Sequence, residues 1–414
     1  MMRSARVCVF AALLVAVPAT VFGQGLPQTS PEQVGLSSER LARIEAIMQA
    51  HVDDGRIAGA VGLVARRGKV AYLESWGLRD MGRGASMETD AIFRIYSMTK
   101  PITSVAVMLL FEEGRFFLND PVGRYLPELR ALEVALPPDS ASGERITRRT
   151  RPITIRDLLR HTSGLSYGFF SDTYVDSLYR EAGVLSRDST LAQMVTTLAS
   201  LPLLYEPGTR WHYSVSTDVL GRLVEVVSGM PLDQFFDERI LDPLGMHDTE
   251  FYVDEARRDR LARMYRHDRN GNLMPGDSTG FLRKPSFLSG GGGLTSTASD
   301  YVRFAQMLLN GGELDGVRLL GTKTVELMTA NHLNDSQRIA SFGFGLGVSV
   351  RRELGAGGTQ GSLGEYGWGG LAGTTFWVDP EEELIGVFMV HINPNRDINF
   401  RNQFKNLVYQ AITN

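Results

Sequence analysis

The sequence has few of the residues that several common kinds of site require. Its 414 residues include one cysteine, Cys8, which lies in an apolar amino-terminal stretch. Because a lone thiol can neither pair nor complete a cysteine-ligated zinc site, the rest of the chain has no disulfide, no such site and no cysteine nucleophile. The seven histidines form no H-E-x-x-H pattern or close ligand pair, so we expect no catalytic metal and no cofactor.

The sequence also lacks a large excess of positive or negative charge. The net charge is −4, and no long run of either sign occurs. Apolar residues make up 43% of the chain and charged residues 22%, which is typical of a globular protein. This balance disfavours nucleic acid and anionic membrane surfaces as partners. We therefore expect a small-molecule partner, an ester or an amide, and the sequence does not indicate an oligomeric state.

The amino terminus lacks the run of about 20 apolar residues that a membrane-spanning helix needs. Arg3 and Arg6 precede an apolar run, residues 7–17, and Pro18 with small residues follows as far as Gly23. This layout is typical of a secretory signal peptide, residues 1–23. We expect cleavage near Gln24 rather than a retained anchor, which predicts a secreted or periplasmic protein.

Strand patterns occur at both ends of the remaining chain. A helix is expected over 37–52, capped by Ser37 or Ser38, and it is followed by strands over 58–65 and 70–76. Further elements are expected near the other end: strands over 344–350, 374–378 and 384–391 and a helix over 400–412. The pattern predicts an α/β (α+β) fold in which both chain ends contribute to one antiparallel sheet.

Helical patterns fill the middle of the chain, from residue 97 to about 283. Five apolar-periodic segments occur there: 105–113, 155–160, 191–199, 219–228 and 232–241. They predict an inserted all-α lobe over 97–284, with an α/β lobe formed by 24–96 and 285–414. A further helix begins at Ser299-Asp300 and ends at Asn310-Gly311-Gly312, where glycine supplies the left-handed terminus.

Two serines are candidate nucleophiles. Ser166 lies in Gly164-Leu165-Ser166-Tyr167-Gly168, which matches G-x-S-x-G, and Ser97 begins Ser97-Met98-Thr99-Lys100, which matches S-x-x-K. A nucleophile elbow needs a buried strand before the serine and a helix after it, and the residues around Ser166 provide neither. We therefore interpret the segment 164–168 as a loop.

Ser97 has the more suitable surroundings, because a helical run follows it. Residues three apart share a helix face, so Lys100 can reach the hydroxyl of Ser97, and first-turn N–H groups favour developing negative charge. Lys100 is the only one of the five lysines with a serine three residues before it. The alternative is an N-cap serine beside a solvent-exposed lysine.

Four segments resemble the β-lactamase-like serine hydrolases: Ile95 to Pro101, Ile155 to Leu165, Pro207 to Ser214 and Gly291 to Asp300. The resemblance extends from about Pro31 to Val390. It implies an antiparallel sheet flanked by helices, an inserted helical lobe and an active site between the lobes. It also implies that Tyr213 is the partner of Ser97 and Lys100.

Two departures from class C β-lactamases change the expected substrate. Their Tyr-x-Asn motif corresponds to Tyr213-Ser214-Val215, and their Lys-Thr-Gly motif to Trp368-Gly369-Gly370. A lost cation there removes a contact to a β-lactam carboxylate worth about 1.5–3 kcal/mol. Family VIII carboxylesterases share this combination, which favours uncharged esters. The resemblance also assigns the oxyanion hole to the backbone N–H groups of Ser97 and Leu371, with Trp368, Gly369 and Gly370 at the cleft.

The expected chemistry is acyl transfer to Ser97. Neutralising a lysine at pH 7 costs about 4 kcal/mol, so a charged Lys100 that assists Tyr213 as the base is the less costly arrangement. A single coupled Tyr213–Lys100 unit is an alternative description. We expect His161 to be structural. Competing functions are a β-lactamase, a D-amino-acid peptidase or penicillin-binding protein, and a non-catalytic module that binds the cell envelope.

Overall fold

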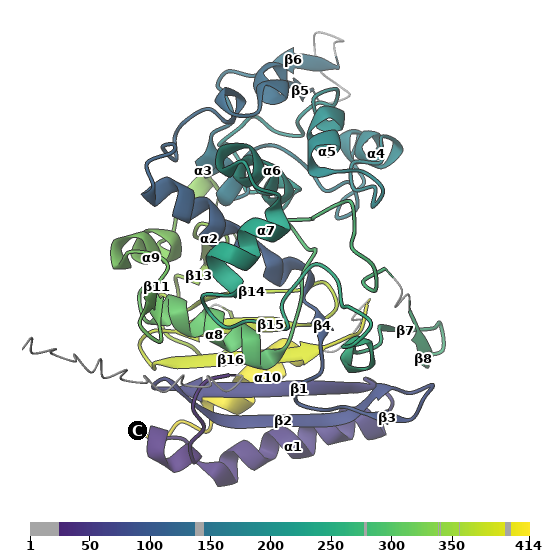
Figure 1. The fold of residues 1–414 in the computed structure, drawn as a ribbon, viewed down its shortest axis with the longest axis vertical. Helices are drawn as coiled ribbons and strands as arrows, with labels where there is room; N and C mark the ends of the chain where they lie inside the picture. Colours follow the sequence, from purple (N-terminus) through teal and green to yellow (C-terminus); the bar gives the residue numbers. More distant parts are fainter. Residues whose placement is uncertain are drawn as a thin grey trace, which may run out of the picture.

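An eight-stranded antiparallel sheet joins the two ends of the chain in this computed structural model (Figure 1). The structure describes residues 25–136, 145–276, 280–337, 339, 341–355, 357–393 and 399–414, so the expected signal peptide lies outside the described residues. The strand order is β12-β13-β14-β15-β16-β1-β2-β3. The strands are β1 (Gly59–Arg66), β2 (Lys69–Asp80), β3 (Ala85–Ser86), β12 (Phe342–Phe344), β13 (Ser349–Arg351), β14 (Tyr366–Gly369), β15 (Thr375–Asp379) and β16 (Leu384–Val390).

The pairing of β1 with β16 closes the sheet between the two chain ends. Ala60 lies opposite Val390, and the register continues to Arg66 opposite Leu384. Each residue of β1 is buried, which means that both faces of the sheet are covered at this strand. The predicted contribution of both chain ends to one sheet is therefore confirmed.

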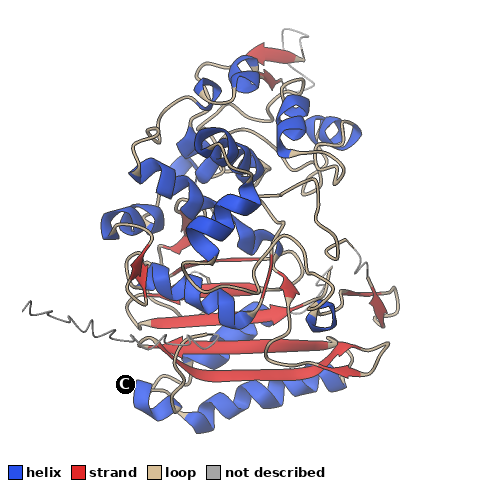
Figure 2. Ribbon diagram, in the orientation of Figure 1, coloured by secondary structure: helices blue, strands red, loops and turns tan. Residues whose placement is uncertain are grey.

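Helices cover the two faces of the sheet (Figure 2). Helix α8 (Ala298–Leu309) packs on β1, β15 and β16, and its side chains join the cluster that contains Val61 and Leu63. Helices α1 (Ser38–Asp53) and α10 (Phe400–Tyr409) cover the opposite face, in a cluster with Ala60 and Val64. Alternate residues of β1 thus supply two different cores, as a strand between two helical layers requires.

The inserted lobe is mainly helical. Its helices are α2 (Thr99–Glu112), α3 (Ile155–Leu159), α4 (Tyr174–Glu181), α5 (Leu191–Leu198), α6 (Ser216–Ser228) and α7 (Leu232–Phe236), which continues as a π-helical turn, η5 (Asp237–Leu241). The expectation of an all-α lobe is wrong in one respect, because two short hairpins also occur there. They pair β5 (Glu133–Ala135) with β6 (Ile146–Arg148) and β7 (Tyr265–His267) with β8 (Leu273–Pro275).

The remaining elements are short connections between these layers. Helix α9 (Thr322–Thr329) follows the hairpin of β10 (Glu313–Leu314) and β11 (Val317–Arg318). Strand β4 (Phe93–Arg94) pairs with β9 (Thr295–Ser296) and links the two lobes beside α2. Single turns of 3-10 helix are η1 (Pro31–Val34), η2 (Tyr96–Met98), η3 (Val122–Arg124), η4 (Pro127–Ala131), η6 (Arg258–Arg260) and η7 (Asp335–Gln337).

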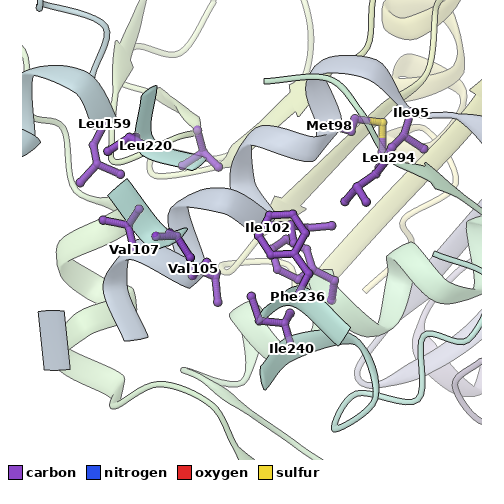
Figure 3. Packing of buried hydrophobic residues seen from close by; sticks show 14 of the residues in the cluster. Ile95, Met98, Ile102, Val105, Val107, Leu159, Leu220, Phe236, Ile240 and Leu294 are labelled. Atoms are coloured by element: carbon purple, nitrogen blue, oxygen red, sulfur yellow. The ribbon is translucent and has the colours of Figure 1, made fainter. Parts of the chain in front are cut away.

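Helix α2 is the buried centre of the molecule. Figure 3 shows Ile102, Val105 and Val107 of α2 among side chains of other elements, including Leu220 of α6. These side chains are 0% exposed. Burial of each such aliphatic side chain contributes about 1.5–3 kcal/mol, so α2 is a rigid support for the residues at its amino-terminal end.

Several predicted boundaries are confirmed and two are corrected. Ser37 caps α1, because its hydroxyl accepts from the backbone N–H of Arg40 at 3.2 Å. The cap of α8 is Thr297 rather than Ser299, since the Thr297 hydroxyl accepts from Asp300 N–H at 3.1 Å. The single strand expected over 344–350 is two strands, β12 and β13, because the chain turns back between them at Gly347, where φ is +95°.

Candidate active site

Ser97 lies where the chain turns sharply from β4 into α2. Tyr96, immediately before it, has a positive φ of 44°, which a non-glycine residue adopts only at some cost in energy. The turn η2 follows and leads directly into α2. Ser97 therefore stands at the amino-terminal end of a buried helix, as the sequence predicts. Ser97 also lines the cavity described below.

Lys100 is 0% exposed and uses all three of its ammonium donors. Its Nζ donates to Ser97 Oγ at 3.2 Å, to the hydroxyl of Tyr167 at 2.8 Å and to the carbonyl of Gly291 at 2.5 Å. Three donors with three acceptors is the arrangement that a charged ammonium satisfies. The predicted contact between Lys100 and Ser97 is therefore present, with the ammonium held against the nucleophile candidate.

Tyr213 reaches the same ammonium through its ring. Lys100 Nζ lies 4.7 Å from the ring centroid of Tyr213. The hydroxyl of Tyr213 accepts from Trp368 Nε1 at 3.2 Å. Among the described residues, Lys100 donates to Tyr167 rather than to Tyr213. The structure thus brings the three predicted residues together, while the role of Tyr213 as base stays a prediction.

Tyr167 is a site residue that the sequence reasoning did not identify. It lies in the G-x-S-x-G segment, one residue after Ser166, and its ring centroid is 5.2 Å from that of Tyr213. Burial, followed by the nearby Tyr213 and Asp218, raises the pKa of Tyr167 well above its ordinary value. Tyr167 is therefore a hydrogen-bonding partner of Lys100 that keeps its proton. Its signal in the sequence is weak, because only the path of the loop brings it to Lys100.

Asp218 is the second residue that sequence reasoning missed. It is 0% exposed in the first turn of α6, and its Oδ1 accepts from Gly291 N–H at 3.0 Å and from the Ser289 hydroxyl at 2.5 Å. An acidic residue in the first turn of a helix, five positions after Tyr213, is the signal that points to it. A helix-terminus role gives the same pattern, so the sequence alone does not separate the two.

The turn after β14 carries the predicted oxyanion donor, Leu371. Arg401 of α10 donates through Nη2 to the carbonyl of Gly370 and through Nε to that of Gly373 at 3.3 Å. The Ser97 and Leu371 backbones line the same cavity. Their assignment as the oxyanion hole agrees with this placement and stays a prediction.

The expected cleft positions of Trp368, Gly369 and Gly370 stay a prediction. None of the three lines the cavity at Ser97. A Cβ at Gly369 would lie 2.8 Å from Arg401 Cζ, and one at Gly370 would overlap the carbonyl of Ile95. Close packing against protein, rather than approach of substrate, therefore requires glycine here. Trp368 acts on the site through its hydrogen bond to Tyr213.

A cavity of about 210 Å³ opens beside Ser97. Aromatic side chains form much of its wall: Phe169, Phe170, Phe251, Phe281 and Phe287. Phe169 and Phe170 are 51% and 52% exposed, so they stand at the mouth, and Leu371 is 42% exposed at the opposite side. An apolar group attached to a reacting carbonyl fits this surface by burial of its area.

Ser166 occupies a different environment. It is 1% exposed, and its hydroxyl donates to Asp176 Oδ1 and contacts His212 Nε2 at 3.3 Å. Several hydrogen bonds, against the effect of burial, lower the pKa of Asp176 to about 2, so it accepts as a carboxylate. Because the hydroxyl donates to a carboxylate inside the protein, Ser166 fixes its loop, as we expect from the sequence.

His161 packs against Tyr213 with ring centroids 4.8 Å apart, and its Nδ1 accepts from Ser214 N–H at 3.3 Å. Burial, then the charge of Lys100, lowers the pKa of His161 well below its ordinary value. A neutral ring that supports Tyr213 agrees with the expected structural role. Within the described ranges, no group of three or more His, Cys, Asp or Glu residues could hold a metal ion. In the same ranges, none of the helices is long and apolar enough to span a membrane.

Comparison with known proteins places this geometry in a family. The beta-lactamase family model matches residues 44–410. Protein Rv1367c of Mycobacterium tuberculosis is 40% identical over 374 residues, which cover 86% of this chain and 90% of that protein. Esterase EstB of Burkholderia gladioli is 33% identical over 364 residues, which cover 82% of this chain and 87% of EstB.

A solved structure has the same arrangement of elements. EstCE1, described as a hydrolase with promiscuous acyltransferase activity, superposes with a TM-score of 0.77 at 30% sequence identity. The match covers 90% of this chain and 99% of EstCE1. The fold predicted from the sequence, a sheet from both chain ends with an inserted helical lobe, is thereby confirmed.

Proposed function

Because this chain belongs to the β-lactamase family of serine hydrolases, we propose that it cleaves carboxylic esters through an acyl-enzyme on Ser97. The observation that carries the proposal is the contact between the buried ammonium of Lys100 and Ser97 Oγ, 3.2 Å long, at the wall of an apolar cavity. The similarity to esterase EstB supports the choice of substrate.

Tyr213 is the proposed base. Lys100 already donates three hydrogen bonds, which suits a charged ammonium rather than a proton acceptor. Of the two phenols beside it, Tyr167 is the poorer base, because burial raises its pKa well above its ordinary value. Tyr213 is half-buried, and the Trp368 indole N–H and the Lys100 charge both favour negative charge on its oxygen.

The reaction proceeds in two steps. Ser97 Oγ attacks the ester carbonyl carbon, its proton passes to Tyr213, and the carbonyl electron pair moves to the oxygen that faces the Ser97 and Leu371 N–H groups. The C–O bond then breaks, and the leaving alcohol takes the proton from Tyr213. Water repeats the sequence on the acyl-enzyme, which releases the carboxylic acid and restores Ser97.

An uncharged ester is favoured over a β-lactam. The position of the family's Lys-Thr-Gly cation is taken by Trp368-Gly369-Gly370, and Trp368 donates its N–H to Tyr213 instead of facing the cavity. Aromatic side chains at the mouth would bury an apolar acyl or alcohol group.

Two substrates offered side by side test the proposal. We expect rapid hydrolysis of 4-nitrophenyl butyrate and little or no turnover of a chromogenic cephalosporin. A fluorophosphonate should add one adduct, located at Ser97 by peptide mass spectrometry. Rapid cephalosporin turnover without ester hydrolysis would assign the chain to the β-lactamases, and an unlabelled chain would support a non-catalytic binding module.

Acyl transfer to an organic alcohol is a second candidate function. The aromatic wall beside Ser97 favours binding of an apolar acceptor at the acyl-enzyme over bulk water. The description of EstCE1 names promiscuous acyltransferase activity, which supports acyl transfer as a function of the present chain. Added hexanol should yield hexyl butyrate by chromatography, and its absence at saturating alcohol would restrict the chain to hydrolysis.

Export of the chain is part of the same proposal. Its support is the amino-terminal pattern of Arg3 and Arg6 before the apolar run of residues 7–17. Amino-terminal sequencing of protein recovered from outside the cytoplasm should begin near Gln24. Protein that retains Met1 would contradict cleavage.

A further inference from the structure

Asp218 is a buried carboxylate that lies beside the catalytic candidates. It is 0% exposed, and it lines the cavity together with Ser97, Tyr167 and Gly291. Its Oδ1 is fully used, by Gly291 N–H at 3.0 Å and by the Ser289 hydroxyl at 2.5 Å. Its Oδ2 is buried and, among the described residues, has no hydrogen-bond partner. A buried carboxylate oxygen without a donor is costly unless a nearby charge compensates it.

The compensating charge is the ammonium of Lys100. Gly291 connects the two residues, because its N–H donates to Asp218 and its carbonyl accepts from Lys100 Nζ at 2.5 Å. Burial raises the pKa of Asp218, whereas the Lys100 charge and the bonds from Ser289 and Gly291 act in the opposite direction and favour the carboxylate. Gly291 therefore links the carboxylate of Asp218 to the ammonium of Lys100.

Tyr167 lies beside the same pair of residues. A Cβ placed on Gly291 would lie 2.5 Å from Asp218 Oδ2 and 2.9 Å from the Tyr167 hydroxyl, so both oxygens lie against one side of Gly291. Tyr167 accepts a hydrogen bond from Lys100 and therefore has its own O–H left to donate. Asp218 Oδ2 is the adjacent acceptor that lacks a donor.

We propose that Asp218 is a positioning residue for Lys100, as the counter-charge that holds the ammonium directed at Ser97 through Gly291 and Tyr167. The proposal rests on the proposed function, since it assigns Asp218 a part in the acylation of Ser97. It adds a fourth residue to the predicted group of Ser97, Lys100 and Tyr213. Among the described residues, the Asp218 side chain hydrogen-bonds to Gly291 and Ser289 and not to Ser97, so it acts through the residues beside it.

Loss of this negative charge has a predictable electrostatic effect. A nearby anion favours the protonated form of each group around it, so its removal lowers the pH at which those groups lose their protons. The groups that face one another here come from α2, the loop after α3, the segment before α6, and α10: Lys100, His161, Tyr167, Tyr213 and Arg401. The alkaline limb of kcat/KM should therefore move to lower pH when Asp218 becomes neutral.

The test is the substitution Asp218→Asn, measured in the full chain. The amide oxygen can still accept from Gly291 N–H and Ser289, so the loop keeps its anchor while the charge is lost. We expect kcat for 4-nitrophenyl butyrate to fall about tenfold or more with little change in KM, and the alkaline limb to move about one pH unit lower. The rate of fluorophosphonate labelling should fall in parallel, which gives a readout of Ser97 reactivity on the folded fraction alone.

Asp300→Asn is the matched control. Asp300 is equally buried in the first turn of α8, its Oδ2 accepts from Asp248 N–H at 2.8 Å and from the Thr249 hydroxyl at 2.9 Å, and its Oδ1 is without a partner. Asp300 thus has the same pattern of hydrogen bonds as Asp218 but lies away from Lys100. The kcat and pH profile of Asp300→Asn should therefore equal those of the wild type.

A further substitution separates a direct role from a merely structural one. Tyr167→Phe removes the hydroxyl that accepts a hydrogen bond from Lys100. Its effect and that of Asp218→Asn should therefore be less than additive in the double variant. An Asp218→Asn enzyme labelled at the wild-type rate, with an unchanged pH profile, would overturn the role of Asp218 alone. A wild-type chain that neither hydrolyses the ester nor reacts with the phosphonate would overturn the proposed function as well.

Discussion

Trp368 donates its indole N–H to the hydroxyl of Tyr213 at 3.2 Å, and the two ring centroids are 5.5 Å apart. Trp368 belongs to β14 of the sheet, whereas Tyr213 precedes α6 of the inserted lobe. This bond therefore joins the two lobes at the proposed base, and it supplies a donor to the oxygen on which negative charge develops.

Trp368→Phe should reduce kcat for ester hydrolysis by about tenfold. The developing phenolate of Tyr213 would lose the indole N–H as a donor, and a hydrogen bond to a charged group contributes about 1.5–3 kcal/mol. The aromatic packing against Phe344, with centroids 5.2 Å apart, is kept by the new ring. Steady-state kinetics with unchanged KM is the expected pattern. Unaltered kcat would show that the indole N–H has no part in the reaction.

Ser97→Ala should abolish hydrolysis and phosphonate labelling, with a loss of about a thousandfold or more in kcat, because no other described group in the cavity replaces the nucleophile. Ser166→Ala should keep kcat. It should lower stability by about 1–3 kcal/mol, because Asp176 loses a buried donor. The opposite result, loss of labelling only in Ser166→Ala, would transfer the nucleophile to the G-x-S-x-G segment.

Arg401→Gln should lower kcat by about 10- to 100-fold, because the guanidinium that holds the carbonyls of Gly370 and Gly373 also fixes the N–H of Leu371 between them. Arg401 acts as a positioning residue, so KM should change little. Arg401→Lys retains the charge but not the two-point contact, and it should recover only part of the rate. Equal kcat for both variants and the wild type would exclude this role.

His391 should make the fold sensitive to acid. Its Nε2 accepts from Arg94 N–H at 2.8 Å, and burial, then the Arg94 charge, lowers its pKa to about 3. The ordinary value is about 6.5, so the neutral ring stabilises the fold fully above that pH, and up to about 5 kcal/mol is lost as the pH falls toward 3. The unfolding free energies of wild type and His391→Gln should therefore converge between pH 7 and pH 4.

The exposed His247 provides the control for this measurement. His247→Gln, measured by urea unfolding, makes the same replacement of histidine by glutamine at an exposed position. A constant gap between His391→Gln and the wild type across the range would contradict the buried, neutral assignment of His391.

Asp300→Asn should show the reverse dependence. Burial raises the pKa of Asp300 to about 6, so its carboxylate is disfavoured in the folded state. The penalty is absent below the ordinary value of about 3.9 and grows to about 3 kcal/mol as the pH rises through 6. The variant should gain stability relative to the wild type between pH 4 and pH 7 by thermal unfolding. A gap independent of pH would show that Asp300 titrates normally.

Local patterns in the sequence predict much of this fold. Ser37 caps α1 at the expected place, and the short hairpin turn at Arg67-Gly68 joins β1 to β2, because capping and turn preferences depend on adjacent residues. The split of 344–350 into two strands was not predicted, since apolar content continues through the turn at Gly347.

The sequence predicted those residues of the candidate site that belong to recognisable motifs. Ser97 and Lys100 are one helical turn apart, so their contact follows from helix geometry. Tyr167 and Asp218 enter the site through loop paths that no periodicity describes, and the segment that joins them, Gly290 to Gly293, resembles an ordinary loop. The resemblance assigned Trp368 to the substrate cleft, but its contact with Tyr213 was not predicted, because it depends on packing between β14 and the inserted lobe.

The pairing of β1 with β16 also sets the order in which activity can arise. Ser97 is synthesised early, whereas β14, β15 and β16, which extend the sheet from β1, are synthesised near the carboxyl end. The turn with Leu371 is further held by Arg401, close to the carboxyl end. A growing chain would therefore contain the proposed nucleophile long before the proposed oxyanion site, and we expect activity only once the last helix is complete.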